Sequence, residues 1–308
     1  MNYPHILASV STHIWALRPD YMALMSAILS ERAFGNKPSA DQIEARIDQQ
    51  RERKVAQQAG DVVVIPVQGV IGNRLRVMQD VSNPMTSAEY LEKQIRAAMD
   101  DERVKAIVLD NDSPGGSVYG VPELGASILA ARGDKPIIAH VNGMCASADY
   151  WVASACDEIV MTGSSEIGSI GVYTMHDDLT ERMKMAGVDR TMISAGKYKV
   201  EGHPFAPLSE EAAEELQSQV DRYYSMFVNA VAEGRGVSAD DVEGRFGQGR
   251  MFGAEDAVKR GLADRIGTLD ETLSRLGVAP SYRERNRRAM KLAEVSAAVS
   301  GGSPASRN

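Results

Sequence analysis

A serine surrounded by small residues stands between a strand-like apolar run and a helix-like apolar run, in VNGMCASADYWVAS at residues 141–154. Gly143, Ala146 and Ala148 leave the backbone around Ser147 uncovered. A serine nucleophile needs this arrangement, because its Oγ must be exposed next to a backbone N–H that can bind the oxygen of the attacked carbonyl. A helix N-cap serine is the common structural alternative, and this segment alone favours it.

Two adjacent glycines form a second candidate element in DNDSPGGSV, residues 110–118. A strand is predicted before them and a helix after them, so the N–H groups of Gly115 and Gly116 lie where an anion or a developing oxyanion would be stabilised. A plain glycine-rich turn explains the segment equally well. A phosphate-binding loop fits poorly, because no lysine follows the glycines at the required spacing.

The residues leave open which base would activate the serine. The histidines are His5, His13, His140, His176 and His203, and only His140 lies on a predicted strand near Ser147. A lysine can serve when burial lowers its pKa toward neutrality. Lys197 and Lys199 occupy alternate positions in SAGKYKVEGHPF (194–205), although solvent-exposed lysines are the plainer interpretation. Ser169, between the glycines of GSIGVY (168–173), is compatible with a simple turn.

The elements that must position these residues alternate between strands and helices. Apolar runs predict strands at 61–71, 104–110, 135–141 and 158–161, with helices near 88–99, 118–131 and 148–155. Strands that are apolar throughout indicate a mainly parallel sheet covered on both faces. Two helices are expected within 19–58. Beyond residue 172 we expect a helix at 176–186, a strand at 191–194, a long helix at 209–233, and a helix closed by Gly261 before a short strand.

Composition indicates a soluble globular protein of 308 residues, of which 44% are hydrophobic and 25% charged. A net charge of −8 argues against nucleic acid as the main partner, and the basic run YRERNRRAMK (282–291) is interpreted as a solvated helix face. The run YMALMSAIL (21–29) is too short to cross a bilayer, so a cytoplasmic protein without a membrane anchor is expected.

The two cysteines and the acidic residues suggest neither a disulfide nor a metal site. Cys145 and Cys156 would lie roughly 16 Å apart on or near a helix, which is too far for a disulfide and fits a reducing compartment. No cluster has metal-ligand spacing and no nucleotide motif is present. No cofactor is therefore expected.

Four segments taken in order carry a resemblance to a known family: SPGGSV, GMCASADYWVAS, GSIGVY and SAGKYKVEGHPF, followed by GRMFGAEDAVKRGLADRIGT. Over about residues 61–270 the chain resembles the signal peptide peptidase A (protease IV) family of serine peptidases. The resemblance implies an α/β fold of the crotonase/ClpP-like type, with a mainly parallel sheet and flanking helices, preceded here by a helical N-terminal extension.

The resemblance also implies a role for each motif residue. The nucleophile is Ser147, and the general base is Lys199 rather than Lys197. Ser169 orients that lysine, and the oxyanion hole is formed by Gly116 and Ala148, with Gly115 in support. The sequence departs from the family at Asp149, where a small residue is usual, and in a minor way at Val200.

A lysine base requires its pKa to fall by roughly 3 units, about 4 kcal/mol of differential solvation. That demands exclusion of water, which a single open sheet rarely provides. Members of the family assemble into rings or domes, so a homo-oligomer is expected.

The charged extension before residue 60 resembles the tailed-phage branch of the family, the capsid assembly or head maturation proteases. The expected organisation is an extension (1–60), a peptidase domain (61–272) and a basic, then Ala/Ser/Gly-rich, flexible tail (273–308). Expected substrates are scaffold, portal or capsid proteins and the chain itself, cleaved without ATP in the procapsid inside the host cytoplasm.

Three other functions remain open from the residues. One is a cytoplasmic peptidase that degrades signal peptides or oligopeptides. Another is a crotonase-like acyl-CoA binder, although Ser147 and the SAGKYK segment would then have no role. The third is a catalytically inactive shell component that retains only the fold.

Overall fold

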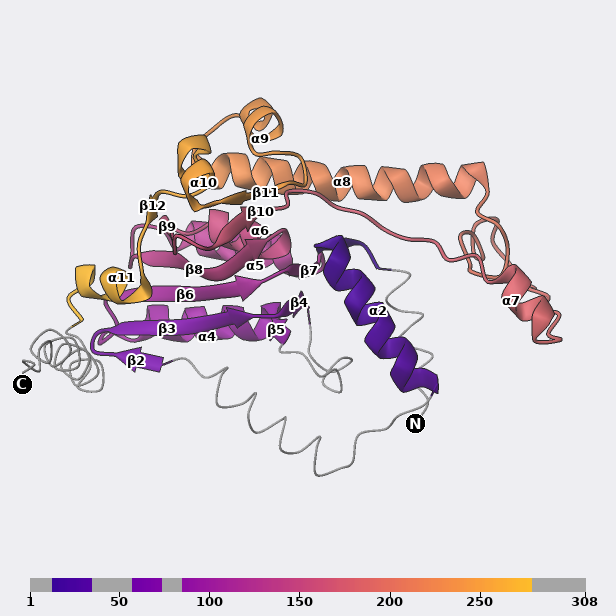
Figure 1. Cartoon of the computed structure of the whole chain (residues 1–308), viewed down its shortest axis with the longest axis horizontal. Coiled ribbons are helices and arrows are strands. Elements are labelled where there is room, and N and C mark those ends of the chain that lie inside the picture. Colours follow the sequence, from indigo (N-terminus) through magenta and orange to yellow (C-terminus); the bar gives the residue numbers. More distant parts are fainter. Residues whose placement is uncertain (1–12, 35–56, 74–84, 279–308) are drawn as a thin grey trace, which may run out of the picture.

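A mainly parallel sheet forms the centre of the protein in the computed structural model, which describes residues 13–34, 57–73 and 85–278. Its strands run in the order β11-β10-β8-β6-β3-β2, and β9 pairs with β8 and β12. The pairs β3/β6, β6/β8, β8/β9 and β8/β10 are parallel, and β2/β3 and β10/β11 are antiparallel. The bounds are β2 Gln57–Ala59, β3 Val62–Gln68, β6 Ala106–Ser113, β8 Ile137–Ala146, β9 Glu158–Met161, β10 Glu166–Gly168, β11 Met251–Gly253 and β12 Arg265–Ile266. The predicted α/β fold is confirmed (Figure 1).

A second, 4-stranded sheet continues from the end of the first in the order β1-β7-β4-β5. It consists of β1 Trp15–Leu17, β7 Gly115–Ser117, β4 Val70–Gly72 and β5 Met85–Ser87. The predicted strand 61–71 is divided between the two sheets at Gly69, whose φ of +68° bends the chain. The second sheet therefore carries the glycine pair away from the end of β6.

The helices α4 Ala88–Asp100, α5 Val121–Ala130 and α6 Ala148–Ser154 cover one face of the central sheet, and α8 Glu210–Arg235 packs against α5 and α6. Their apolar faces and the strands form the largest buried cluster. Ser87 caps α4, because its hydroxyl oxygen accepts a hydrogen bond from the Tyr90 N–H at 3.2 Å. The Thr86 hydroxyl forms hydrogen bonds with the backbone of Gln68. α8 is anchored through its C-terminal half, where Phe227 stacks on Trp151 with ring centroids 4.6 Å apart.

The opposite face of the sheet is covered at one end by α11 Leu269–Arg275 (Figure 1). Leu269 and Leu273 pack there against a smaller apolar cluster that includes Val108 and Val160. Arg265 and Arg275 both form ion pairs with Glu158. Two short helices, α9 Ala239–Arg245 and α10 Ala254–Arg260, complete the C-terminal part, and Gly261 ends α10 as predicted.

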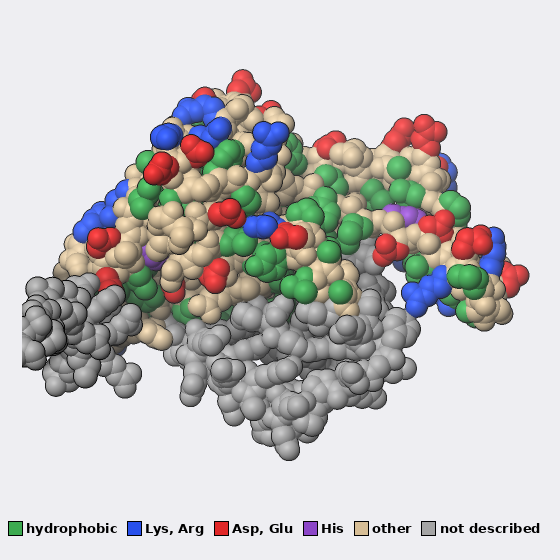
Figure 2. Space-filling view, viewed as in Figure 1, with side chains coloured by type: hydrophobic (Ala, Val, Ile, Leu, Met, Phe, Trp, Pro, Cys, Tyr) green, Lys and Arg blue, Asp and Glu red, His purple; other side chains and the backbone are tan. Residues whose placement is uncertain are grey.

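Residues 172–209 form an arm that extends from the body and carries the short helix α7 Thr180–Met185 (Figures 1 and 2). The strand predicted at 191–194 is wrong, because residues 191–199 are all exposed and pair with no strand. Its apolar residues, among them Ile193 at 95% exposure, find no sheet edge within the described chain. The arm therefore presents apolar side chains to its surroundings.

The N-terminal extension is only partly helical where it is described. α2 Pro19–Phe34 confirms a helix from residue 19, but β1 and β2 are strands. The remainder of the second predicted helix, and the tail beyond residue 278, lie outside the described residues. The domain boundaries at 60 and 272 stay predictions. No helix among the described residues is long and apolar enough to cross a membrane.

Candidate active site

Ser147 occupies a strained turn between β8 and α6. Its φ of 55° and ψ of −114° lie outside the regions that L-residues normally adopt, and such a conformation costs about 1–3 kcal/mol. The Ser147 N–H donates to the Gly168 carbonyl at 2.8 Å, and its carbonyl accepts from the Trp151 N–H at 2.9 Å. The turn is thus fixed from both sides. The side chain does not cap α6, so the structure does not support the N-cap alternative.

The glycine pair lies directly against Ser147. A Cβ added to Gly115, whose φ is +97°, would come within 2.9 Å of the Ser147 Cβ. A Cβ on Gly116 would come within 1.9 Å of the Ile71 carbonyl oxygen in the neighbouring strand. Close approach of the backbone therefore requires glycine at both positions. The structure brings together the two segments that the sequence analysis proposed as nucleophile and oxyanion site.

Ala148 and Ser169 also lie at this site. Ala148 is the first residue of α6, and an N–H in a first helical turn has no intrahelical acceptor. Gly168 pairs with Ala146 across β10 and β8, so Ser169 follows beside Ser147. Ser169 has a φ of 57°, and its N–H donates to the Arg250 carbonyl at 2.8 Å.

Lys199 does not lie at this site within the chain. The neighbouring Tyr198 hydroxyl donates to Glu211 at the start of α8 at 3.0 Å. Ser147 is one helical turn from Trp151, which stacks on Phe227 near the other end of α8. At 1.5 Å per residue, about 24 Å of helix separates Glu211 from Phe227. That is far beyond the reach of a lysine side chain, and Lys199 is exposed on the arm.

The other candidate bases are placed less suitably. Lys197 forms an ion pair with Glu211 at 2.7 Å, and the hydrogen bonds to Glu211 and Tyr198 raise its pKa, opposite to what a base requires. His140 is buried beneath α11, with Nδ1 3.5 Å from the Thr272 Oγ1, and burial lowers its pKa to about 4. It lies about 20 Å before Ser147 along β8.

The structure buries Asp149, the carboxyl group two residues after Ser147 at which the sequence departs from the family. Asp149 is completely buried and accepts a hydrogen bond from Asn111 Nδ2 at 2.7 Å. Burial raises the pKa of Asp149 to about 8, against the lowering effect of hydrogen bonds from Asn111 and Cys145. Asp149 is therefore a neutral carboxylic acid at neutral pH. The partner of Asp149 was not identified from the sequence. The signal for it was Asn111, a polar residue in a buried strand.

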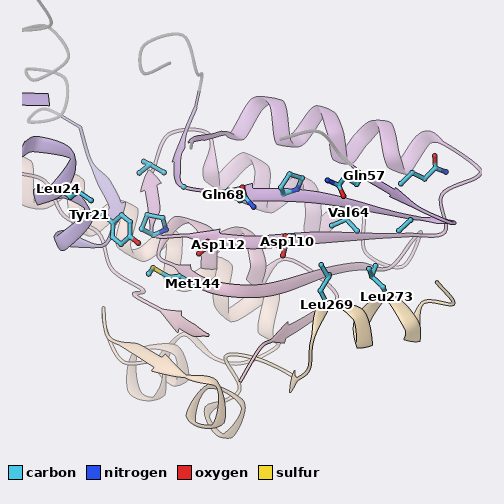
Figure 3. Close-up of a pocket in the computed structure, with 16 residues that line it drawn as sticks. Tyr21, Leu24, Gln57, Val64, Gln68, Asp110, Asp112, Met144, Leu269 and Leu273 are labelled. Atoms are coloured by element: carbon cyan, nitrogen blue, oxygen red, sulfur yellow. The ribbon is translucent and has the colours of Figure 1, made fainter. Parts of the chain in front are cut away.

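A groove of about 750 Å³ crosses the face of the central sheet between α2 and α11 (Figure 3). Tyr21 and Met144 line one end, close to Pro114, and Leu273 lines the other. Asp110 and Asp112 point into it from β6. Burial raises the pKa of both carboxyl groups. The groove begins beside the glycine pair, so an extended chain leaving the site can enter it.

The described residues contain no cluster of three or more His, Cys, Asp or Glu side chains that could hold a metal ion. Cys145 and Cys156 are both free thiols and both buried. Burial raises the pKa of each thiol, which makes either one a poor nucleophile.

Comparison with known proteins places the chain among the peptidases. Residues 130–280 match the family model described as Peptidase family S49, a range that includes Ser147, the GSIGVY segment and the arm. Over this range the chain is similar to that peptidase family. This confirms the recognition of the signal peptide peptidase family made from the four motifs.

Two of the similar proteins come from phages. The chain is 29% identical over 97% of its length to the head-tail preconnector protein GP5 of Enterobacteria phage P21, and 29% identical over 86% to the capsid assembly protease C of Escherichia phage lambda. It spans 62% and 63% of those proteins. It is 30% identical to Protease 4 of Salmonella typhi, over 71% of the chain and 35% of that protein.

Proposed function

We propose that this chain is a serine endopeptidase with a Ser147–Lys199 dyad that cleaves protein components of a phage head, and itself, during capsid maturation. The observation that carries the proposal is the strained turn at Ser147, held against a glycine pair that tolerates no side chain. Strain of this kind is found where a backbone is fixed for function. Similarity to a peptidase family supplies the class of bond that is cleaved.

The proposed reaction assigns one step to each group. The Ser147 Oγ attacks the carbonyl carbon of a peptide bond, and Lys199 Nζ takes the hydroxyl proton. The N–H groups of Gly116 and Ala148 bind the oxyanion, as preorganised donors in a site that excludes water. Lys199 then gives its proton to the departing amine, and water hydrolyses the acyl-enzyme. Ser169 orients Lys199.

The base must come from a second copy of the chain. About 24 Å of α8 lies between the part of the arm next to Lys199 and the part of the body next to Ser147. The arm exposes Met185 at 83% and Ile193 at 95%, which is apolar surface suited to contact with another molecule. A homo-oligomer in which the arm of one copy lies over Ser147 of the next would bury these side chains and desolvate Lys199.

The phage-head substrates are inferred from the extent of the matches. A match over 97% of the chain includes most of the first 60 residues, so the extension is shared with a phage protein as well as the peptidase region. The matched relatives in this group are named for head-tail connection and capsid assembly. Scaffold, portal or capsid proteins are the corresponding substrates for this chain.

Subunit mixing tests the dyad and its origin together. Ser147→Ala and Lys199→Ala should each abolish cleavage of a co-expressed scaffold protein, followed by intact mass. Mixing the two inactive proteins under conditions of subunit exchange should restore up to about a quarter of the activity, since one site in four would then combine both intact residues. Lys197→Ala is the matched control and should retain activity.

Other results would reject specific parts of the proposal. A mixture that stays inactive despite proven exchange would place the base in the same chain as the nucleophile. Cleavage that survives Ser147→Ala would reject the nucleophile. Loss of activity in Lys197→Ala, with Lys199→Ala still active, would assign the role of general base to Lys197 instead of Lys199.

The second candidate function is an oligopeptide or signal-peptide peptidase, favoured by the similarity to Protease 4 over 71% of the chain. A library of short peptides would be cleaved faster than scaffold protein in that case. No feature of the described site favours an acyl-CoA binder.

A further inference from the structure

The short strand β1 lies between two segments of the candidate active site. On one side it pairs antiparallel with β7, which carries the glycine pair. On the other side Trp15 exchanges two backbone hydrogen bonds with Tyr173, at 2.8 and 3.0 Å, just beyond the GSIG turn. An extended segment of the N-terminal region thus occupies the space between the two segments that flank Ser147.

The register of this strand directs one particular carbonyl at the site. The Arg18 N–H donates to the Pro114 carbonyl at 3.0 Å, and the Val118 N–H donates to the Ile14 carbonyl at 3.3 Å. In an antiparallel ladder, every second pair of opposite residues is joined by hydrogen bonds. Ala16 and Gly116 lie midway between the pairs Ile14/Val118 and Arg18/Pro114, so they are also a hydrogen-bonded pair. The Gly116 N–H, the proposed oxyanion donor, therefore faces the Ala16 carbonyl.

The nucleophile lies next to the same carbonyl. A Cβ added to Gly115 would be 2.3 Å from the Ala16 carbonyl oxygen and 2.9 Å from the Ser147 Cβ. The Ala16 carbonyl oxygen and the Ser147 side chain therefore both lie next to Gly115. Ser147 is 1% exposed, although the proposed reaction requires it to meet a substrate. The strand that covers the site is part of the same chain.

The side chains of β1 alternate between two environments. Ile14 and Ala16 belong to the main core, where Ala16 is completely buried. Trp15 and Leu17 belong to a separate cluster that includes Val70 and, at its margin, Tyr173. Because the Ala16 side chain is fully enclosed, an extended peptide bound in place of β1 needs a small residue at that position.

We propose that residues 14–18 occupy the peptide-binding edge of β7 in their own chain, in the register of a substrate, so that this edge accepts extended peptides resembling IWALR and is closed to others until β1 leaves. This rests on the proposed function, because Gly116 and Ser147 have their assigned roles only in that reaction. The edge of β7 that a substrate would extend is the edge that β1 now occupies.

Peptide binding to the full chain provides the test. The probe is a fluorescein-labelled peptide HIWALRPD, copying residues 13–20, and its anisotropy is measured with Ser147→Ala protein so that nothing is cleaved. Trp15→Asp places a charge in an apolar cluster and should displace β1. Tyr90→Asp is the matched control, because Tyr90 is 50% exposed and lies on α4, outside both β1 and the groove between α2 and α11. We expect the Trp15→Asp protein to bind the probe at least tenfold more tightly than the parent and the control.

A second probe tests the register, and a second variant protects against misfolding. A peptide with phenylalanine in place of the Ala16 equivalent should lose at least tenfold in affinity, because the position is enclosed. If Trp15→Asp does not fold by circular dichroism, Trp15→Gly takes its place. A folded variant that binds the probe no better than the parent would overturn the proposal, and so would equal binding of the two peptides.

Binding and cleavage also separate this inference from the proposed function. Tighter probe binding by the Trp15→Asp variant, together with scaffold protein that stays intact in the presence of protein with Ser147 unchanged, would retain the proposed role of the β7 edge and reject the peptidase assignment. Cleavage that depends on Ser147, without any gain in probe binding, would retain the peptidase assignment and reject the proposed role of the β7 edge.

Discussion

Asp149 allows a test of the site through stability rather than activity. The carboxyl group is fully buried two residues beyond Ser147, and burial raises its pKa to about 8 from an ordinary value of 3.8. The folded protein therefore retains a proton that the unfolded chain has lost between about pH 4 and pH 8. Stability from this group is fully present below pH 4 and is lost as pH rises through 8.

The size of the effect follows from the shift. One proton of difference changes the free energy of unfolding by about 1.4 kcal/mol per pH unit, or about 2.7 kcal/mol between pH 5 and pH 7. Asp149→Asn replaces the acid by a neutral group of similar shape and removes this contribution. The difference in unfolding free energy between wild type and variant should therefore shrink, or change sign in favour of the variant, as pH rises.

Urea unfolding at pH 5, 6 and 7, followed by tryptophan fluorescence at fixed protein concentration, measures that difference. The exposed Asp134→Asn is the control and should keep the wild-type pH profile. The other carboxyl groups near the site, Asp110 and Asp112, are present in every protein compared and cancel. Parallel profiles for wild type and Asp149→Asn would show that Asp149 is not protonated in the folded protein, and would refute the reasoning.

Two glycine substitutions test close backbone contacts. Gly116→Ala places a Cβ within 1.9 Å of the Ile71 carbonyl oxygen, so the strand must move; we expect a loss of roughly 3 kcal/mol in unfolding free energy and at least 100-fold in peptidase activity. Gly234→Ala places a Cβ within 2.2 Å of the Ser154 carbonyl oxygen where α8 crosses α6, and should cost roughly 1–3 kcal/mol. Gly244→Ala, with no atom within 4 Å, is the control for both in urea unfolding, and a cost equal to theirs would contradict the steric argument.

The regular elements were predictable because each carries a local signal. The strand predicted for EIVM at 158–161 has the observed bounds, and the helix predicted at 209–233 closely matches α8. An unbroken apolar run and a 3.6-residue periodicity are both visible in the sequence without knowledge of the neighbouring elements. The strand expected at 191–194 shows the limit of this reasoning. Its residues have the composition of a strand, but no neighbouring edge is available to pair with them within the described chain.

The site was predictable where motifs place residues on consecutive elements, and unpredictable where it depends on separation in space. Ser147, Gly116 and Ser169 meet because parallel strands end at one edge of the sheet. Nothing in SAGKYK indicates that α8 carries this segment about 24 Å away from the nucleophile. β1 was missed because three residues before a helix are too few to show alternation.

Under the proposed function, the arm and β1 each concern one requirement of the reaction. A lysine loses its charge only when it is removed from water. Lys199 lies on an exposed arm, so as the proposed base it would have to be desolvated by contact with another copy. A peptide carbonyl has to reach the Gly116 N–H, and β1 presents one from within the chain. In the proposed reaction the single chain would therefore lack both the base and a free β7 edge. In the proposed role in capsid maturation, contact between copies would supply the base, and substrate would displace the strand.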